Sequence, residues 1–456
     1  MNTLDALHSG ALHGARQVKL ACGLTEFPPA LLELADTLEV LDLSDNALSS
    51  LPDDFSRLHK LRILFCSNNQ FTHLPEILGQ CAHLSMVGFK ANQIQTVSEH
   101  ALGTGLRWLI LTDNQIDALP ASIGQCTELQ KLMLSGNRLK ALPYELSRCT
   151  RLELLRIAAN QLDELPSWLT SMPRLSWLAY AGNPLCAQME ASVLAAAPSP
   201  AIPWDQLEIL KILGQGASGV IYQAKQQCGK QTRPVAVKIF KGDVTSDGLP
   251  RSEMAACIGA GSHRGLIPVL GTVAHHPADA QGLVMPLIDP QFHSLAHPPS
   301  FDSCTRDVYE QDAHFTWATV VRLAQTVACA GAHLHGRGIM HGDLYAHNIL
   351  HDGHGGALLG DFGAASFYRP EGDPAPGALQ ALEVRAFGCL LEEWIERCMP
   401  PSESMSDWAA LEELKCRCLS LAPANRPLFN EIESIVKAMV ASLPGEDRHD
   451  ILAPAI

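Results

Sequence analysis

Three glycines in the second half of the chain have the spacing of a phosphate-binding loop. Gly214, Gly216 and Gly219 lie in LEILKILGQGASGVIYQAK, which begins at Leu207. This spacing is a weak signal by itself because several nucleotide-binding folds share it. Here the glycines lie between two stretches with the pattern of β-strands. We therefore expect a hairpin over phosphates, where the missing side chains let backbone N–H groups approach the oxygens.

A lysine and a glutamate follow at a spacing that also suits phosphate binding. Lys238 lies in PVAVKIF, which has the pattern of a strand, and Glu253 follows fifteen residues later in RSEMAACIGA, which we expect to be helical. A lysine held by a carboxylate can bind the α- and β-phosphates of a nucleotide. Farther along, LVMPLI (283–288) predicts a strand that enters a hinge at Met285.

Two later motifs complete a pattern that resembles a known family. MHGDLYAHNIL begins at Met340 and LLGDFGAAS begins at Leu358. From about residue 204 to 440 the chain resembles a eukaryotic-type protein kinase, because the order and spacing of all these motifs agree. The lead-in IPWDQLEILKILGQGASG is similar to that of the tyrosine-kinase-like group, whose members mostly phosphorylate serine or threonine. The resemblance implies transfer of the γ-phosphate of ATP, with Mg²⁺, to a protein.

The resemblance also implies a role for each matching residue. The residues implied to contact ATP are Gly214, Gly216, Gly219, Val220, Ala236, Lys238 and Met285. Lys238 would pair with Glu253 and bind phosphates. Asp343 would orient the substrate hydroxyl and accept its proton, while Asn348 and Asp361 would hold Mg²⁺.

The catalytic loop departs from the family in three places. Gly342 precedes Asp343 where many kinases have the arginine that receives a phosphorylated activation loop, so we do not expect loop phosphorylation to be the switch. Tyr345 replaces the lysine of serine/threonine kinases, and His347 replaces the arginine of tyrosine kinases. Protonated His347 can replace the missing cation in part. Loss of such a group can cost on the order of 10²–10³ in rate, so we expect slow or unusual catalysis.

The segment after Asp361 is shorter than in the family. EVRAFGCLLEEW supplies Glu383 in place of an aspartate, and counting back twelve residues gives 369–371 as a degenerate APE motif. We expect Glu371 of this motif to pair with Arg426, and the usual peptide-docking ledge to be missing.

These features leave three functions open. The first is an active kinase with serine/threonine specificity. The second is a pseudokinase scaffold that binds nucleotide and partners without efficient transfer, which Tyr345 and the short segment favour. The third is phosphorylation of a small, non-protein acceptor, which the short segment would suit.

The first part of the chain is a repeat. The pattern LxxLxLxxNxLxxLP recurs with a period of 23 residues and a single 22, from starts at 38, 61, 84, 106, 129, 152 and 175. One such unit cannot bury its leucines, so several must stack into a solenoid. The asparagine of each unit can bond backbone groups in the bend. We expect an irregularity in the third repeat, which has Val97-Ser98 in place of Leu-Pro.

The side chains expected on the concave side of this solenoid are unusually apolar. Such a stripe usually marks a partner site. We therefore predict a protein substrate or regulator on the concave face, anchored by Trp108, Met133 and Trp177. The alternative is that the curvature of the solenoid, or the kinase domain, covers these residues.

The predicted fold class is an α/β leucine-rich-repeat solenoid followed by a bilobal α+β protein kinase fold. The predicted boundaries are 1–37 for an N-terminal cap region with a degenerate repeat, 38–186 for the repeats, 187–203 for a linker, 204–445 for the kinase domain and 446–456 for a tail.

The composition limits the kinds of partner and the cellular compartment that we expect for the chain. A net charge of −15 argues against nucleic acid as a partner. No run approaches the roughly 18 apolar residues that span a bilayer. The fourteen cysteines are scattered, which is typical of reduced thiols in a cytoplasmic protein rather than of a disulfide framework.

Overall fold

The computed structural model of the chain describes residues 3–196, 199–216, 218–242, 244–245, 247–369, 375–401 and 404–443. The chain forms two compact units, Met1–Arg174 and Leu175–Ile456. The domain boundaries proposed above remain a prediction.

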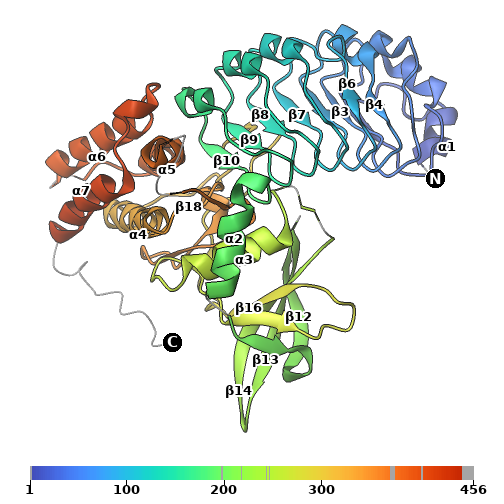
Figure 1. Cartoon of the computed structure of the whole chain (residues 1–456). Coiled ribbons are helices and arrows are strands. Elements are labelled where there is room, and N and C mark those ends of the chain that lie inside the picture. The colour runs from blue at the N-terminus through green and yellow to red at the C-terminus, as the bar shows by residue number, and fades with distance from the viewer. Residues whose placement is uncertain are drawn as a thin grey trace. The chain divides into compact units, whose positions relative to one another are not determined.

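The N-terminal unit is a stack of short parallel strands (Figure 1). After helix α1 (Thr3–His8), these strands are β1 (Gln17–Lys19), β2 (Val40–Asp42), β3 (Ile63–Phe65), β5 (Met86–Gly88), β7 (Trp108–Ile110), β8 (Lys131–Met133) and β9 (Leu154–Arg156). Successive strands pair in register, so equivalent residues lie side by side. The central leucines Leu41, Leu64 and Leu109 have no exposed surface. The repeat period therefore sets the pairing, because each turn delivers its leucine onto the previous one.

The return path of each repeat is formed largely by short 3₁₀ helices. They span Pro29–Leu34, Phe55–Arg57, Glu76–Gln80, Ala121–Gln125, Tyr144–Arg148 and Ser167–Ser171. Pro75, Pro120, Pro143 and Pro166 directly precede four of them, with φ between −60° and −71°. The proline ring therefore fixes the entry into these turns. The third repeat differs at this point. Its Val97 lies in strand β6 (Thr96–Val97), which pairs with β4 (His73–Leu74) of the preceding repeat, and this confirms the predicted irregularity.

The asparagines form the predicted ladder of backbone bonds. The Asn160 amide donates to Leu134 O at 3.0 Å and to Ile157 O at 3.1 Å, while its Oδ1 accepts from Leu139 N at 3.0 Å. Asn137 and Asn114 repeat these contacts one and two turns earlier. Each side chain thus satisfies buried backbone groups of two adjacent repeats.

The C-terminal unit begins with strand β10 (Trp177–Ala179) and helix α2 (Pro184–Ala196). A six-stranded sheet follows, in the order β11-β15-β16-β14-β13-β12. Its strands are β11 (Ala201–Pro203), β12 (Leu207–Gln215), β13 (Gly219–Cys228), β14 (Gln231–Phe240), β15 (Gly271–Ala274) and β16 (Gly282–Pro286). Helix α3 (Pro250–Ala260) follows β14 in the chain, and Val235, Val237 and Val284 form the centre of the sheet's core.

The rest of this unit is mostly helical, and Figure 1 shows its helices as a group separate from the sheet. The helices are α4 (Trp317–Gly336), α5 (Pro376–Glu396), α6 (Met405–Cys418) and α7 (Phe429–Ala441). The short strands are β17 (His293–Ser294), β18 (Ile339–Met340), β19 (Ile349–His351), β20 (Ala357–Leu359) and β21 (Ser366–Phe367). Helices α4 and α7 pack closely at Gly331, where a Cβ would lie 2.9 Å from the Phe429 ring.

These two units confirm the predicted fold class, a repeat solenoid followed by a domain made of a sheet and a helical part. In the described part of the chain, no helix has both the length and the apolar character required to cross a membrane.

Candidate active site

The three glycines lie at the end of the β12–β13 hairpin. Gly214 pairs with Ile221, and Gly216 N donates to Gly219 O at 3.0 Å to close the turn. A Cβ on Gly219 would lie 2.5 Å from Ile239 O, so the neighbouring strand requires this glycine. A Cβ on Gly214 or Gly216 would meet nothing within 4 Å. Packing within the protein therefore does not require these two glycines.

Lys238, Glu253 and Asp361 meet beside this hairpin. Lys238 extends from β14 and forms an ion pair with Glu253 Oε1 of α3, and the two side chains are only 9% and 4% exposed. Asp361 Oδ1 lies 3.8 Å from Lys238 Nζ. Burial by itself lowers the pKa of Lys238, but the Asp361 and Glu253 carboxylates raise it above its usual range. The lysine therefore remains a cation, as a phosphate ligand must.

The two carboxylates of this cluster respond in opposite ways to their surroundings. Burial raises the pKa of Glu253, and the Lys238 ammonium opposes that rise. The Asp361 side chain is about half exposed; desolvation by the surrounding protein acts to raise its pKa, but Lys238 and the Gly363 N–H outweigh it, so this pKa lies below its usual range. Asp361 has a φ of 53°, which residues other than glycine seldom adopt. Such backbone strain is often found at functional sites.

Three of the other residues predicted to contact ATP lie on adjacent strands. Ala236 of β14 pairs directly with Met285 of β16. Val220 of β13 pairs with Ile239, on the other side of β14. The sheet thus brings Val220, Ala236 and Met285 to the region of the glycine hairpin and Lys238.

The catalytic loop holds Asp343 and Asn348 together. The Asn348 amide donates to Asp343 Oδ2 at 2.7 Å and to Asp343 O at 2.9 Å, from a 3₁₀ turn at Ala346–Asn348. The His341 ring accepts from Asp343 N through Nδ1 and donates from Nε2 to Gly360 O at 2.9 Å. His341 therefore ties this loop to the residue before Asp361.

Glu383 of α5 anchors the backbone of the same loop. Its carboxylate accepts from His341 N at 3.2 Å, from Gly342 N at 2.6 Å and from His335 Nε2 at 2.7 Å. It is buried, and burial alone would raise its pKa. The His335 bond and the other donors outweigh burial, so the pKa of Glu383 lies below its usual range. The longer glutamate reaches the position that the family gives to aspartate.

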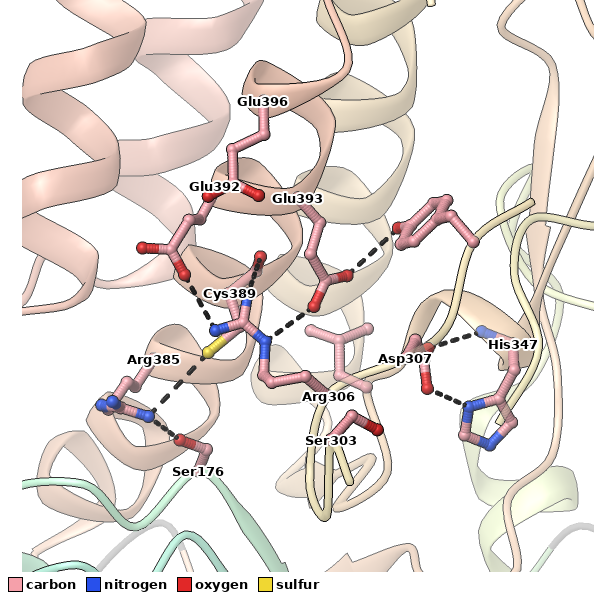
Figure 2. A network of polar contacts seen from close by, with 12 residues as sticks. Ser176, Ser303, Arg306, Asp307, His347, Arg385, Cys389, Glu392, Glu393 and Glu396 are labelled. Carbon is pink, nitrogen blue, oxygen red and sulfur yellow. Dashed lines mark hydrogen bonds and ion pairs between the residues drawn. The ribbon is translucent and has the colours of Figure 1, made fainter. Parts of the chain in front are cut away.

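His347 is held by a carboxylate that sequence reasoning missed. Asp307 accepts from His347 N at 2.9 Å and from the ring Nδ1 at 2.8 Å (Figure 2). Burial acts to lower the pKa of His347, but Asp307, and to a smaller extent Asp343 and Asp361, raise it above its usual value. Asp307 precedes His347 by forty residues in a stretch without periodic pattern, so nothing in the sequence links the two.

Arg306, next to Asp307, ties the same stretch to α5. Its guanidinium donates to Glu393 at 2.7 Å, to Glu392 at 2.8 Å and to Cys389 O at 3.0 Å (Figure 2). The network of Figure 2 thus fixes the chain on which Asp307 sits, and through it the ring of His347.

The structure corrects the prediction for Trp177. This residue was expected to be an exposed anchor for a partner, but only 1% of its surface is exposed. Its ring stacks on Tyr345 of the catalytic loop, with centroids 4.3 Å apart and planes 6° apart. An aromatic ring satisfied in this way is not open to a partner. Trp108 and Met133, by contrast, are half-buried, and Lys131 Nζ lies 4.2 Å above the Trp108 ring.

The start of the activation segment is held by a short strand. Strand β21 pairs with β18. The hydroxyls of Ser366 and Tyr368, which follow Asp361, are buried. The predicted ion pair between Glu371 and Arg426 lies outside the described residues, because Glu371 belongs to the stretch 370–374. Burial lowers the pKa of Arg426 to about 10, and its guanidinium donates to Ala381 O and Ser420 O.

Comparisons with known proteins agree with this architecture. A model of the protein kinase domain matches residues 207–387, and models of leucine-rich repeats match residues 36–78 and 104–162. The chain therefore carries leucine-rich repeats followed by a protein kinase domain.

Individual relatives each match a part of the chain. Leucine-rich repeat and calponin homology domain-containing protein 1 of Mus musculus is 31% identical over 132 residues, which are 28% of this chain and 18% of the relative. Ephrin type-A receptor 8 of Rattus norvegicus is 26% identical over 282 residues, 52% of this chain and 71% of the relative. Human serine/threonine-protein kinase A-Raf is 23% identical over 294 residues, 54% of this chain and 45% of the relative. The chain thus spans less than half of two of these three relatives.

Proposed function

We propose that the chain is an active protein kinase, which transfers the γ-phosphate of ATP to serine or threonine of a protein substrate. The observation that carries this proposal is the arrangement of two groups of side chains. Lys238, Glu253 and Asp361 form one charged cluster, and Asp343 is hydrogen-bonded to Asn348 beside it. Phosphoryl transfer depends mainly on such positioning and on electrostatic stabilisation.

The same residues suit the two cofactors. Asn348 and Asp361 offer the amide and carboxylate oxygens that Mg²⁺ prefers. Bound there, Mg²⁺ would neutralise charge on the phosphates. Lys238 would hold the α- and β-phosphates under the glycine hairpin, and Asp343 would orient the acceptor hydroxyl and take its proton. The ring of His347, fixed by Asp307, would supply part of the cation that Tyr345 does not.

Specificity for serine or threonine rests on two similarities. The lead-in before the glycine hairpin resembles the tyrosine-kinase-like group, whose members mostly modify these residues. A-Raf, one of the relatives, is named a serine/threonine-protein kinase. The cytoplasm is the proposed location, since the cysteines in the described residues are free thiols, most of them buried.

A transfer assay with radiolabelled ATP tests the proposal. The intact chain and Asp343→Asn would be incubated with Mg²⁺ and a generic protein acceptor, and the labelled amino acids identified after hydrolysis. We expect phosphoserine or phosphothreonine with the wild type and a loss of at least 10²-fold with Asp343→Asn, since the proton acceptor is removed. Equal label with both proteins would refute the proposal.

A pseudokinase scaffold is the second candidate, and Tyr345 favours it. Tyr345 stacks on Trp177 instead of offering a cation to the phosphoryl group. This candidate predicts nucleotide binding without transfer. Label in a small molecule rather than in protein would favour a non-protein acceptor.

The repeats are proposed to bind the substrate or a regulator. Trp108 and Met133 are the residues proposed to anchor that protein, since Trp177 is buried. Trp108→Ala should weaken capture of that protein without changing transfer to a generic acceptor.

A further inference from the structure

One segment before the kinase sheet contacts three parts of the candidate active site. It comprises residues 175–196, that is β10, the turn after it and α2, and we call it the brace. The brace belongs to the C-terminal compact unit together with the catalytic residues. None of its contacts follows from the kinase motifs, which begin only at Gly214.

The first contact is with the catalytic loop. Trp177 stacks on Tyr345, two residues after Asp343, and its Nε1 donates to Leu344 O at 3.1 Å. Beside it, Ser176 Oγ accepts from the Arg385 guanidinium of α5 at 2.8 Å (Figure 2). The indole thus holds both the side chain and the backbone of the loop that carries Asp343.

The second contact is with the activation segment. Ser366 Oγ accepts from Tyr180 N at 3.0 Å and from Ala181 N at 3.1 Å. Ser366 has no exposed surface, so these bonds are shielded from water. The Cys186 thiol of α2 adds a weak bond to Phe367 O at 3.7 Å. The hydroxyl of Ser366 is therefore engaged as an anchor between the brace and the activation segment.

The third contact is with α3, the helix that carries Glu253. Ser252 Oγ donates to Glu190 Oε2 at 2.9 Å, and Gly182 N donates to Glu190 Oε1 at 2.9 Å. Glu190 is 7% exposed and Ser252 is 2% exposed. Bonds to a charged acceptor are the strong ones, and burial strengthens them. Glu190 therefore links the turn after β10 to the residue next to Glu253.

We propose that the brace is a built-in positioning element that holds α3, the catalytic loop and the activation segment in the arrangement required for phosphoryl transfer. This inference rests on the proposed function. Kinase activity requires the Lys238–Glu253 pair to be in place, and many kinases achieve this by phosphorylating the activation segment. Here the packing of residues 175–196 does so in the unmodified chain. Glu190 is a positioning residue that acts through Ser252 on Glu253.

The test compares Glu190→Ala, Glu190→Gln and Ser252→Ala in the full chain. Ser192→Ala is the matched control, because this exposed hydroxyl of α2 donates to Gln188 O within its own helix. We expect Glu190→Ala and Ser252→Ala to lower kcat/KM for ATP at least fivefold, and the double variant to lose no more than either single one. Glu190→Gln keeps an acceptor oxygen and should recover part of the rate. Hydrogen exchange should become faster in Pro250–Ala260 and stay unchanged in α7.

The outcomes separate this inference from the proposed function. Suppose that the wild type transfers phosphate, and that Glu190→Ala and Ser252→Ala behave like Ser192→Ala in both rate and α3 exchange. The inference that the brace positions α3 would then be overturned. A wild type without transfer refutes the proposed function, while faster α3 exchange in Glu190→Ala would still support the holding role. Mass spectrometry of the active protein should find Ser366 and Tyr368 unmodified, and a phosphate on either would overturn the inference.

Discussion

Removal of the Glu383 carboxylate should destabilise the helical part of the kinase domain strongly. Glu383→Ala would leave His335 Nε2, His341 N and Gly342 N without their acceptor in a buried site. The matched control is Glu396→Ala on the same helix, because the Glu396 side chain is 65% exposed.

The expected magnitude follows from these three bonds. A hydrogen bond to a charged group contributes about 1.5–3 kcal/mol. Three of them do not add fully, and loss of one partner from a buried charged network costs about 3–5 kcal/mol. We adopt the latter value for Glu383→Ala. The exposed control should change stability by less than about 0.5 kcal/mol.

Native-state hydrogen exchange is the suitable assay, because it reports local opening in a chain that need not unfold in one step. The most protected amides of α4 and α5 should exchange roughly 10²- to 10⁴-fold faster in Glu383→Ala, since about 1.4 kcal/mol corresponds to a factor of ten. Exchange in Glu383→Ala equal to that in Glu396→Ala would refute the reasoning.

The pH dependence of the same site provides an independent check. Burial acts to raise the pKa of Glu383, but the His335 bond and the other donors outweigh burial and lower this pKa from 4.5 in the folded chain. The stabilisation by this carboxylate is therefore complete above pH 4.5 and is lost as the pH falls through the folded pKa. The difference between wild type and Glu383→Gln should shrink below this pH. A stability difference between the two proteins that stays constant as the pH falls below 4.5 would contradict a lowered pKa of Glu383.

Three further changes probe other parts of the chain. Asn160→Ala should cost about 1–3 kcal/mol more than Asn46→Ala in urea unfolding, because its orphaned backbone partners are buried whereas Cys22 N, a partner of Asn46, is exposed. Arg306→Ala should cost about 3–5 kcal/mol, measured by exchange in α5, since the buried Glu393 carboxylate loses its cation and keeps the Tyr309 hydroxyl as a partner; no change would exclude a structural role for the network of Figure 2. Burial lowers the pKa of His263 from 6.5, and the charges of His333 and Arg264 lower it further. The wild type should therefore lose stability as the pH falls below 6.5, and His263→Gln should lose less. Equal melting curves for the two proteins between about pH 5 and about pH 7.5 would contradict this.

The sequence by itself determined the repeat architecture and the kinase motifs. The period of 23 residues set how the leucines and asparagines stack, because each repeat contacts mainly its neighbours. The spacing of Gly214, Lys238, Glu253, Asp343 and Asp361 identified the residues of the candidate site through the family resemblance. These signals are either periodic or contained in compact motifs, which is why they can be found without coordinates.

Only the tertiary structure decided what supports that site. Asp307 holds His347, Glu190 holds Ser252, and Trp177 covers Tyr345 rather than facing a partner. The members of the last two pairs come from segments more than sixty residues apart, and none of the three contacts carries a periodic or motif signal. Such contacts depend on how the completed elements pack, since burial selects the partner of each polar or aromatic group. The sequence therefore predicted the groups of the candidate site, while the fold determined which neighbours hold them.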